Sequence, residues 1–330
     1  MPSAPSPAPR PSDAAASDSI ASAFAPASIG NMGVGYDVLG GAVDVAGDHV
    51  TVRRLDTPEI RIDVIRGCPV NLPTAPEENT ATAGLVALQR DRDLPFGFAV
   101  AIEKGTPLSA GMGGSAASAV GAVVAANALL AEPMPRNEVL HYALIGEAAA
   151  SGSIHPDNVA PSLYGGLILT RDVDPPDPIP LPTPDDVVCV LVHPDLEIQT
   201  RDARNVVPND IPVATAVRQS AHLGAFVAAC YRNDRALLRR ALRDVMIEPH
   251  RAALVPGFAE VQSAAMDAGA FGCTLAGAGP SLFAWCDASS AETVRDAMHD
   301  AFAANDVAAE AWISPIDAPG ARLVDRHVAV

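Results

Sequence analysis

The chain has 330 residues, a length that suggests roughly two domains of ordinary size. Hydrophobic residues make up 49% of it and aromatic residues only 4%, so its core must consist mainly of aliphatic side chains. The formal net charge of −17 at pH 7 repels nucleic acid and anionic membranes, and we expect neither as a partner. Ordinary solubility and adaptation to high salt are both compatible with this charge.

The cysteines and the first residues bear on location. The five cysteines are scattered and form no C-x-x-C pair, which predicts free thiols in a reducing cytoplasm. No uninterrupted apolar stretch of about 18 residues occurs, so we expect no membrane span. Residues 1–18 are mainly Pro, Ser and Ala and lack the apolar run of a signal peptide, which predicts a disordered tail.

Predicted helices and strands mix along the whole chain. In the first half the strands cover residues 43–54, 60–65, 98–103 and 163–170, and the helices cover 77–90, 115–131 and 137–151. In the second half the strands cover 187–192, 273–275, 281–286 and 309–313, and the helices cover 213–231, 235–245, 258–268 and 291–303. The Pro- and Asp-rich stretch 172–185 predicts a domain boundary. Because regular βαβ alternation is missing, the pattern favours an α+β fold.

A glycine-rich segment, PLSAGMGGSAA at residues 107–117, leads directly into the long helix predicted at 115–131. Glycines let the backbone approach an anion closely, and a helix start offers free N–H groups and the positive end of its dipole. A phosphate would bind there, and Ser115 in the first turn can offer a hydroxyl to phosphate or to Mg²⁺. The alternative is a glycine-rich connection that serves close packing only.

Two other phosphate motifs fit this segment less well. Gly111, Gly113 and Ala116 match G-x-G-x-x-A, but a Thr-Pro turn separates them from the preceding strand. The acids at the right distance, Glu132 and Glu138, flank a helix break rather than a strand end. A P-loop is excluded, because the chain has no G-K-[ST].

Three further constellations carry polar residues that chemistry could use. Asn31 and Asp37 lie among the glycines of residues 26–37, either as part of a turn that Asp37 caps or as a clamp for an amine or hydroxyl. Glu147 lies in an apolar helix, where its carboxylate must pair with an arginine, bind a metal or stay exposed. Residues 274–281 form a second glycine turn between predicted strands.

In this order, residues 26–37, 107–117 and 274–283 resemble the three motifs of the GHMP kinase superfamily, named for galactokinase, homoserine kinase, mevalonate kinase and phosphomevalonate kinase. The middle motif usually reads P-x-x-x-G-L-G-S-S-A, and here Met112 replaces the Leu and Gly114 the first Ser. Within the superfamily the chain is most similar to the homoserine kinase family. Three segments support this over residues 19–313: HPDNVAPSLYGG (155–166), T-R-x-A-R before a Val-Pro (200–208), and E-P-x-R…P-G-F (248–258).

The resemblance implies a two-domain α+β fold. Residues 19–175 would form an N-terminal nucleotide-binding domain similar to a ribosomal protein domain, and residues 186–330 a ferredoxin-like C-terminal domain. It implies an enzyme that uses ATP and Mg²⁺ to phosphorylate the hydroxyl of L-homoserine, giving O-phospho-L-homoserine in threonine biosynthesis. The transfer would be direct and without an evident side-chain base, in a cytoplasmic protein of a family that often forms homodimers. Another GHMP-type small-molecule kinase, or a non-catalytic binding protein on the same fold, is the alternative.

The resemblance also assigns site residues. The amino acid site would consist of Asn31, Asp37, His155, Asn158, Arg204 and Arg251. Thr200 and Arg204 would lie at the reacting hydroxyl, and Ser115 and Glu147 would ligate Mg²⁺ and serve catalysis. Asn79 would lie near the adenine. The triphosphate cradle would consist of Pro107, Leu108, Ser109, Ala110, Gly111, Met112, Gly113, Gly114, Ser115, Ala116 and Ala117.

Overall fold

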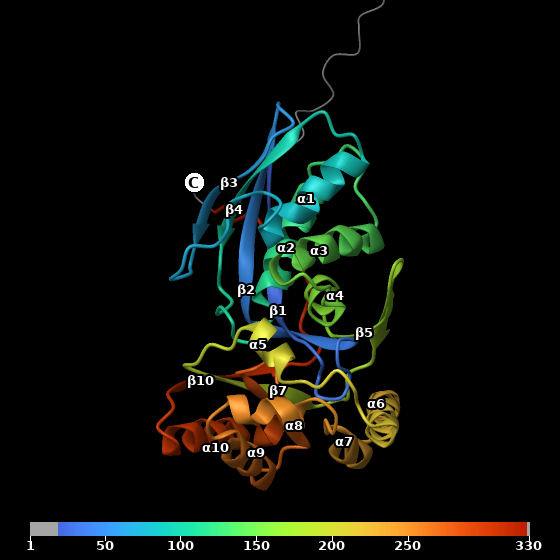
Figure 1. Cartoon of the computed structure of the whole chain (residues 1–330), viewed down its shortest axis with the longest axis vertical. Coiled ribbons are helices and arrows are strands. Elements are labelled where there is room, and N and C mark those ends of the chain that lie inside the picture. Colours follow the sequence, from blue (N-terminus) through green and yellow to red (C-terminus); the bar gives the residue numbers. More distant parts are fainter. Residues whose placement is uncertain (1–18, 329–330) are drawn as a thin grey trace, which may run out of the picture.

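The computed structural model describes residues 19–328 and contains two sheets with helices packed against each (Figure 1). The tail predicted at residues 1–18 lies outside the described residues. Among residues 19–328 no helix is long and apolar enough to cross a membrane.

The first sheet is mostly antiparallel. Its strands run in the order β11 (Arg322–Leu323), β1 (Ile20–Ile29), β2 (Leu39–Leu55), β4 (Gly97–Glu103) and β3 (Ile60–Arg66), and only β3 and β4 are parallel. β5 (Leu167–Val173) pairs with the start of β2, and β6 (Pro176–Leu181) pairs with β5. The β1–β2 register shifts between Pro26 and Ala27, at the point where the proline lacks an N–H for the ladder.

Four helices belong to this sheet: α1 (Thr80–Asp91), α2 (Gly114–Asn127), α3 (Arg136–Ser151) and α4 (Pro156–Tyr164). They lie on one side of the sheet, and α2 is in contact with β1, β2, α1 and α3 (Figure 1). Most residues of α2 are buried and small, which lets its backbone lie close to all these neighbours. The start of α2 is therefore fixed at the lower edge of this half.

The second sheet has the order β10 (Ala309–Pro315), β7 (Val187–Pro194), β9 (Leu282–Asp287) and β8 (Gly272–Leu275), all antiparallel. Its helices are α5 (Thr200–Asn205), α6 (Val213–Arg232), α7 (Arg235–Ala241), α8 (Glu248–Arg251), α9 (Phe258–Asp267) and α10 (Ala291–Ala304). Helices α9 and α10 cover the face turned away from the first sheet (Figure 1). The β-α-β-β-α-β order confirms the predicted ferredoxin-like arrangement.

One of the three buried hydrophobic clusters in the described structure spans both halves, and we call it the shared core. Ile29 and Met32 from the first half pack in the same buried cluster as Phe226 and Trp285 from the second. Polar segments at the rim of this core are therefore held in fixed positions relative to one another.

Of the strands and α-helices that the structure describes, α5, α8 and β11 were absent from the sequence prediction, and so were three others. β1 was not predicted, α4 lies where a break was expected, and β6 lies inside the stretch 172–185 that was expected to separate the domains. β6 pairs on one side only, and its prolines are tolerated because an edge strand needs fewer N–H donors. The predicted C-terminal domain covered residues 186–330. The structure differs at the end of this range, because β11 pairs with β1 at Ala23 and Phe24 and so belongs to the first sheet.

Candidate active site

The three glycine-rich segments meet where the two halves join. Ser28 N–H donates to the Met112 carbonyl at 3.0 Å, which ties the end of β1 to the loop before α2. Gly277 N–H donates to the Gly30 carbonyl at 3.1 Å, and Ser281 Oγ donates to the Ala110 carbonyl at 2.6 Å. Segments far apart in sequence thus form one continuous surface of backbone.

Close packing explains the glycines of residues 107–113, which we call the phosphate loop. Gly111 has φ 75°, and a β-carbon there would lie 2.2 Å from the Ala276 carbonyl oxygen. Gly113 has φ 63°, and its β-carbon would lie 2.2 Å from Ser28 Oγ. The side chains of Ala110 and Met112 point into the shared core, so the loop presents its main chain before α2 begins.

Next to the start of α2, a buried carboxylate receives a hydroxyl. Ser115 Oγ donates to Glu147 Oε1 at 2.9 Å, and His155 Nδ1 lies 3.3 Å from the same oxygen. Glu147 is only 4% exposed, and within the described part of the chain its Oε2 atom has no hydrogen-bond partner. The oxygens of a hydroxyl and of a carboxylate are hard ligands of the kind that Mg²⁺ prefers, and Oε2 is available to bind this ion. The two predicted metal ligands therefore fit a magnesium ion.

His155 links this pair to the rest of the junction. Burial of its ring disfavours the charged form, but the hydrogen bond to Glu147 and the charges of Glu147 and Asp157 outweigh this effect. The pKa of His155 is therefore raised above its ordinary value. A protonated ring would hold the Glu147 carboxylate in place.

An acidic and two basic side chains lie together beside these residues. Arg204 Nη2 donates to Asp37 Oδ1 at 2.9 Å, and Arg204 Nη1 donates to Asp37 Oδ2 at 3.3 Å. Arg251 is buried, and its Nε and Nη1 donate to the carbonyls of Ala203 (2.9 Å) and Gly277 (3.2 Å). Asp37 was a candidate to cap a backbone N–H, but in the described structure its carboxylate pairs with Arg204.

The two predicted asparagines shape the same surface. Asn31 Nδ2 donates to the Gly277 carbonyl at 2.9 Å, the oxygen that Arg251 also reaches, and Asn31 Oδ1 accepts from Asp37 N–H at 3.0 Å. Asn158 Oδ1 accepts from Ser28 Oγ at 3.2 Å, beneath the phosphate loop. All six residues predicted for the amino acid therefore belong to one junction.

Two predicted residues stand apart from this group. Thr200 is exposed at the first position of α5, although Gln199 next to it donates from Nε2 to Ser109 Oγ at 3.2 Å. Asn79 caps α1: its Oδ1 accepts from Ala81 N–H at 3.0 Å, and its Nδ2 donates to the Pro73 carbonyl at 2.7 Å. A role at the adenine for Asn79 stays a prediction.

Comparison with known proteins agrees with this geometry. The chain matches the GHMP kinases N terminal domain over residues 79–166 and the GHMP kinases C terminal domain over residues 226–304. It is 50% identical to a homoserine kinase of Xylella fastidiosa (strain M12), covering 92% of this chain and 94% of that relative.

The chain belongs to the homoserine kinase family. A second relative, the homoserine kinase of Xanthomonas campestris pv. campestris (strain B100), is 46% identical over 92% of this chain and 94% of its own. The crystal structure of homoserine kinase from Cytophaga hutchinsonii superimposes with a TM-score of 0.90 at 38% identity, over 94% of this chain and 99% of that one. The predicted GHMP kinase fold is confirmed.

Sequence reasoning missed two residues at this junction, Tyr36 and Asp157. The Tyr36 hydroxyl accepts from Arg204 Nη1 at 3.1 Å, and its ring centroid lies 5.8 Å and 5.3 Å from the guanidinium carbons of Arg204 and Arg251. Tyr36 precedes Asp37 in the first motif, and Asp157 lies between His155 and Asn158 in the HPDN segment. Position within these motifs was the available signal for both.

Asp157 is a buried carboxyl group. It is 2% exposed, its Oδ2 accepts from Asn31 N–H at 2.9 Å, and among the described residues its Oδ1 has no hydrogen-bond partner. Burial, together with the nearby charge of Asp37, raises the pKa of Asp157 from 3.8 to about 7, although His155 acts in the opposite direction. The folded protein therefore binds this proton more tightly than the unfolded chain does.

Replacing Asp157 by asparagine is expected to change how stability depends on pH. A raised folded-state pKa costs stability as pH rises from near 4 to near 7, whereas asparagine does not titrate and can still accept from Asn31 N–H. Relative to wild type, Asp157→Asn should gain roughly 2 to 4 kcal/mol between pH 4.5 and pH 8. Urea unfolding at both pH values measures this difference. A difference that stays constant with pH would contradict the assignment.

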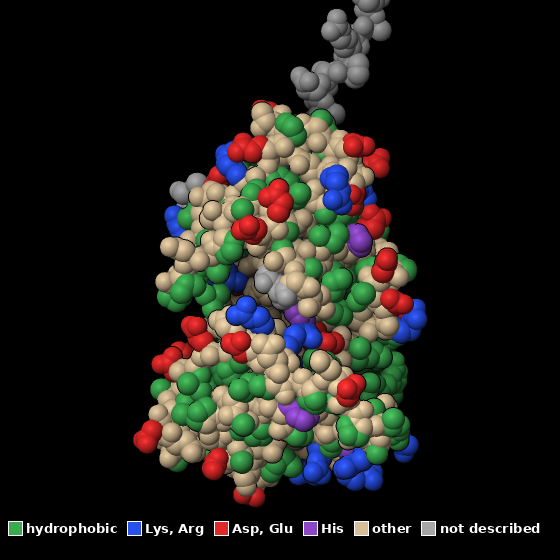
Figure 2. Space-filling model, viewed as in Figure 1, with side chains coloured by type: hydrophobic (Ala, Val, Ile, Leu, Met, Phe, Trp, Pro, Cys, Tyr) green, Lys and Arg blue, Asp and Glu red, His purple; other side chains and the backbone are tan. Residues whose placement is uncertain are grey.

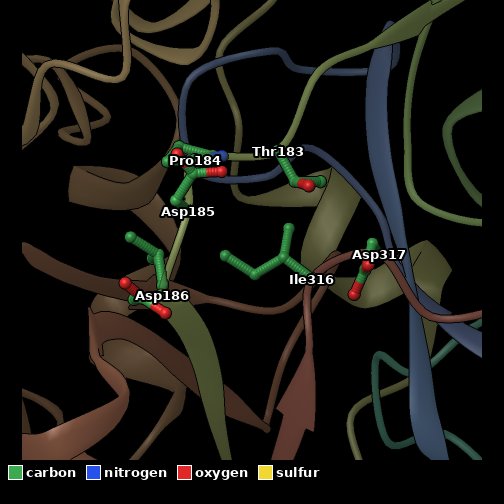
Figure 3. A pocket seen from close by; sticks show the side chains of 7 residues that line it. Thr183, Pro184, Asp185, Asp186, Ile316 and Asp317 are labelled. Atoms are coloured by element: carbon green, nitrogen blue, oxygen red, sulfur yellow. The ribbon is translucent and has the colours of Figure 1, made fainter.

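The structure also contains a hollow outside the predicted site. It has a volume of about 520 Å³ and is lined by residues 183–187, Ile316 and Asp317, with Asp186 and Asp317 on either side of Ile316 (Figure 3). None of the predicted site residues lines it. In Figure 2 basic side chains and a histidine gather at the recess between the two halves.

Proposed function

We propose that this chain is an ATP-dependent homoserine kinase with its active site at the junction of the two halves. The observation that carries the proposal is the pairing of Asp37 with Arg204, next to Arg251 and beside the phosphate loop. An amino acid zwitterion carries one charge of each sign, and this cluster offers the complement of both.

The amino acid would enter by exchange. Its ammonium group would take the place of Arg204 at the Asp37 carboxylate, and its carboxylate would bind Arg204 and Arg251, because guanidinium groups grip carboxylates with paired hydrogen bonds. The exchange replaces one ion pair by two, so neither Asp37 nor Arg204 is left without a counter-charge. An uncharged substrate such as a sugar would offer no such compensation, which argues against a GHMP-type kinase that acts on a sugar.

The triphosphate would lie over the phosphate loop and the start of α2. There the free N–H groups of the first helical turn and the dipole of α2 favour negative charge. Ser115 and Glu147 would hold Mg²⁺, which supplies neutralisation of charge on the phosphate oxygens when it is bound. Retention of this hydroxyl–carboxylate pair argues against a non-catalytic binding protein.

The reaction is a direct transfer between two oxygens. The hydroxyl oxygen of homoserine forms a bond to the γ-phosphorus of ATP, the bond from that phosphorus to the bridging oxygen breaks, and ADP leaves. The hydroxyl proton passes to an oxygen of the transferred phosphate, since such transfer depends on positioning and charge stabilisation more than on a base. The products are O-phospho-L-homoserine and ADP.

A coupled ADP-release assay with Mg-ATP tests the proposed substrate. L-homoserine, L-threonine, L-serine, mevalonate and galactose would be compared at low and at molar KCl. We expect turnover with L-homoserine to exceed turnover with each of the others. Preferred turnover of mevalonate or galactose would instead indicate another GHMP-type kinase, and nucleotide binding without any turnover would indicate a binding protein.

The location of the protein, its pathway and its oligomeric state rest on less specific observations. All five cysteines are free thiols in the described structure, which supports a reducing cytoplasm as the location. The product supports a role in threonine biosynthesis. A homodimer stays a prediction, which the molar mass measured by light scattering would test.

A further inference from the structure

A buried charged cluster lies beneath the phosphate loop and has no part in the mechanism above. It consists of Asp48 from β2, Lys104 directly after β4, and Ser118 from α2. These residues are 0%, 6% and 3% exposed, and Lys104 is the only lysine in the chain. Removing two charges from water is costly, so a buried ion pair by itself is a poor source of stability.

The Asp48 carboxylate reaches both ends of the phosphate loop. Its Oδ1 accepts from the N–H groups of Gly105 (3.1 Å) and Thr106 (3.2 Å), the two residues directly before the loop. Its Oδ2 accepts from Ser118 Oγ at 2.6 Å and from Lys104 Nζ. Ser118 lies in the second turn of α2, the helix that begins directly after the loop.

Lys104 adds a second connection to the same helix. Its Nζ donates to the Gly114 carbonyl at 2.5 Å and to Ser118 Oγ at 2.9 Å. Gly114 is the first residue of α2 and follows the last loop residue. Together the three side chains tie the entry of the loop (105–106) to its exit (114 and 118).

The middle of the loop is held by two other segments of the chain. The Met112 carbonyl accepts from Ser28 N–H, and the Ala110 carbonyl accepts from Ser281 Oγ. A backbone cradle binds a phosphate well only if its N–H groups already point at the anion, because ordering the loop during binding would cost affinity. These contacts do not hold the two ends of the loop, and the cluster holds both of them.

We propose that Asp48 and Lys104 are positioning residues for the nucleotide. They hold the phosphate loop and the first turn of α2 in the geometry that binds the triphosphate, and they act through the loop rather than by touching the substrate. This rests on the proposed function only in that a nucleotide binds at this loop. The packing of α2 against β1, β2 and α3 stabilises the fold independently of the cluster.

The test is the affinity of the full chain for Mg-ADP, measured by titration calorimetry, for wild type and Lys104→Met. Methionine fills similar space without donating to Asp48, Gly114 or Ser118. We expect the dissociation constant for Mg-ADP to rise about tenfold or more, since small misplacements of binding groups have effects of this size. The Michaelis constant for the phosphate acceptor should change less than about twofold, because the amino acid contacts are untouched.

Two further variants make the test decisive. Ser118→Ala keeps the ion pair and should raise the dissociation constant about threefold, which covers the case that Lys104→Met does not fold. Val294→Ala, in α10 at 0% exposure, serves as the control for lost stability, and its affinity for Mg-ADP should equal that of wild type.

The outcomes separate the two proposals. Unchanged affinity in both cluster variants would overturn the positioning role, as would an equal loss of affinity in Val294→Ala. A wild type that binds Mg-ADP without turning over homoserine would overturn the proposed activity alone. A wild type that binds no Mg-ADP would overturn both.

Discussion

Replacing Glu147 by glutamine is expected to lower kcat by about a thousandfold or more, since charge stabilisation at a transferring phosphate is worth effects of this order. Glutamine keeps the shape of the side chain and can still accept from Ser115 Oγ, but it removes the negative charge that would hold Mg²⁺. The measurement is kcat at several Mg²⁺ concentrations. The Mg²⁺ concentration needed for half-maximal rate should rise as well.

The same helix provides a matched control. Glu138 lies in the first turn of α3, half-buried and paired with Arg92, so Glu138→Gln removes one charge without touching the junction. Its kcat should stay within about twofold of wild type, as expected for a surface change away from the site. If Glu147→Gln behaves like Glu138→Gln, with unchanged kcat and Mg²⁺ dependence, Glu147 does not ligate the metal.

Replacing Arg251 by methionine is expected to raise the Michaelis constant for homoserine by roughly 10- to 100-fold, because a charge-assisted hydrogen bond to the substrate carboxylate is lost. The constant for ATP should change little, since Arg251 lies against Tyr36 and the Gly277 carbonyl rather than at the phosphate loop. Methionine is chosen over alanine because Arg251 is buried and alanine would leave a cavity.

Steady-state kinetics with each substrate varied in turn measure this effect. Arg240→Met is the control. Arg240 is exposed, and among the described residues its only partner is the Ala236 carbonyl of its own helix. This variant should leave both Michaelis constants unchanged. Calorimetric melting separates a weakened fold from a weakened site. An unchanged constant for homoserine in a folded Arg251→Met protein would remove this arginine from the substrate site.

The elements that sequence predicted well have strong local patterns. The Ala-rich helix, the glycine-rich turn before it and the strands of the second sheet follow from periodicity and glycine placement. β1 reads IASAFAPASI, whose small residues and internal proline resemble a loop, and only pairing with β2 and β11 makes it a strand. The helix α4 contains Pro161 in its interior, which reads as a break, although the packing of α4 against β1 and β2 sustains the helix.

Site residues could be predicted by type, but their partners could not. Glu147 was expected to pair with an arginine, bind a metal or stay exposed. It is buried, its hydrogen-bond partners are Ser115 and His155 rather than an arginine, and metal binding stays a prediction. The bond between Asp157 and Asn31 N–H joins residues 126 positions apart, and no periodicity encodes such a contact. Pairings of this kind arise from the way α4 packs under the first motif, which only the folded chain determines.

The most direct test of the central claim is the product formed from L-homoserine and Mg-ATP, observed by ³¹P NMR, with Glu147→Gln as the matched inactive variant. The account predicts a phosphomonoester signal that grows in step with ADP in the wild-type sample and is nearly absent in the variant. Free phosphate in place of the phosphomonoester, or no consumption of ATP by the folded wild-type protein, would contradict it.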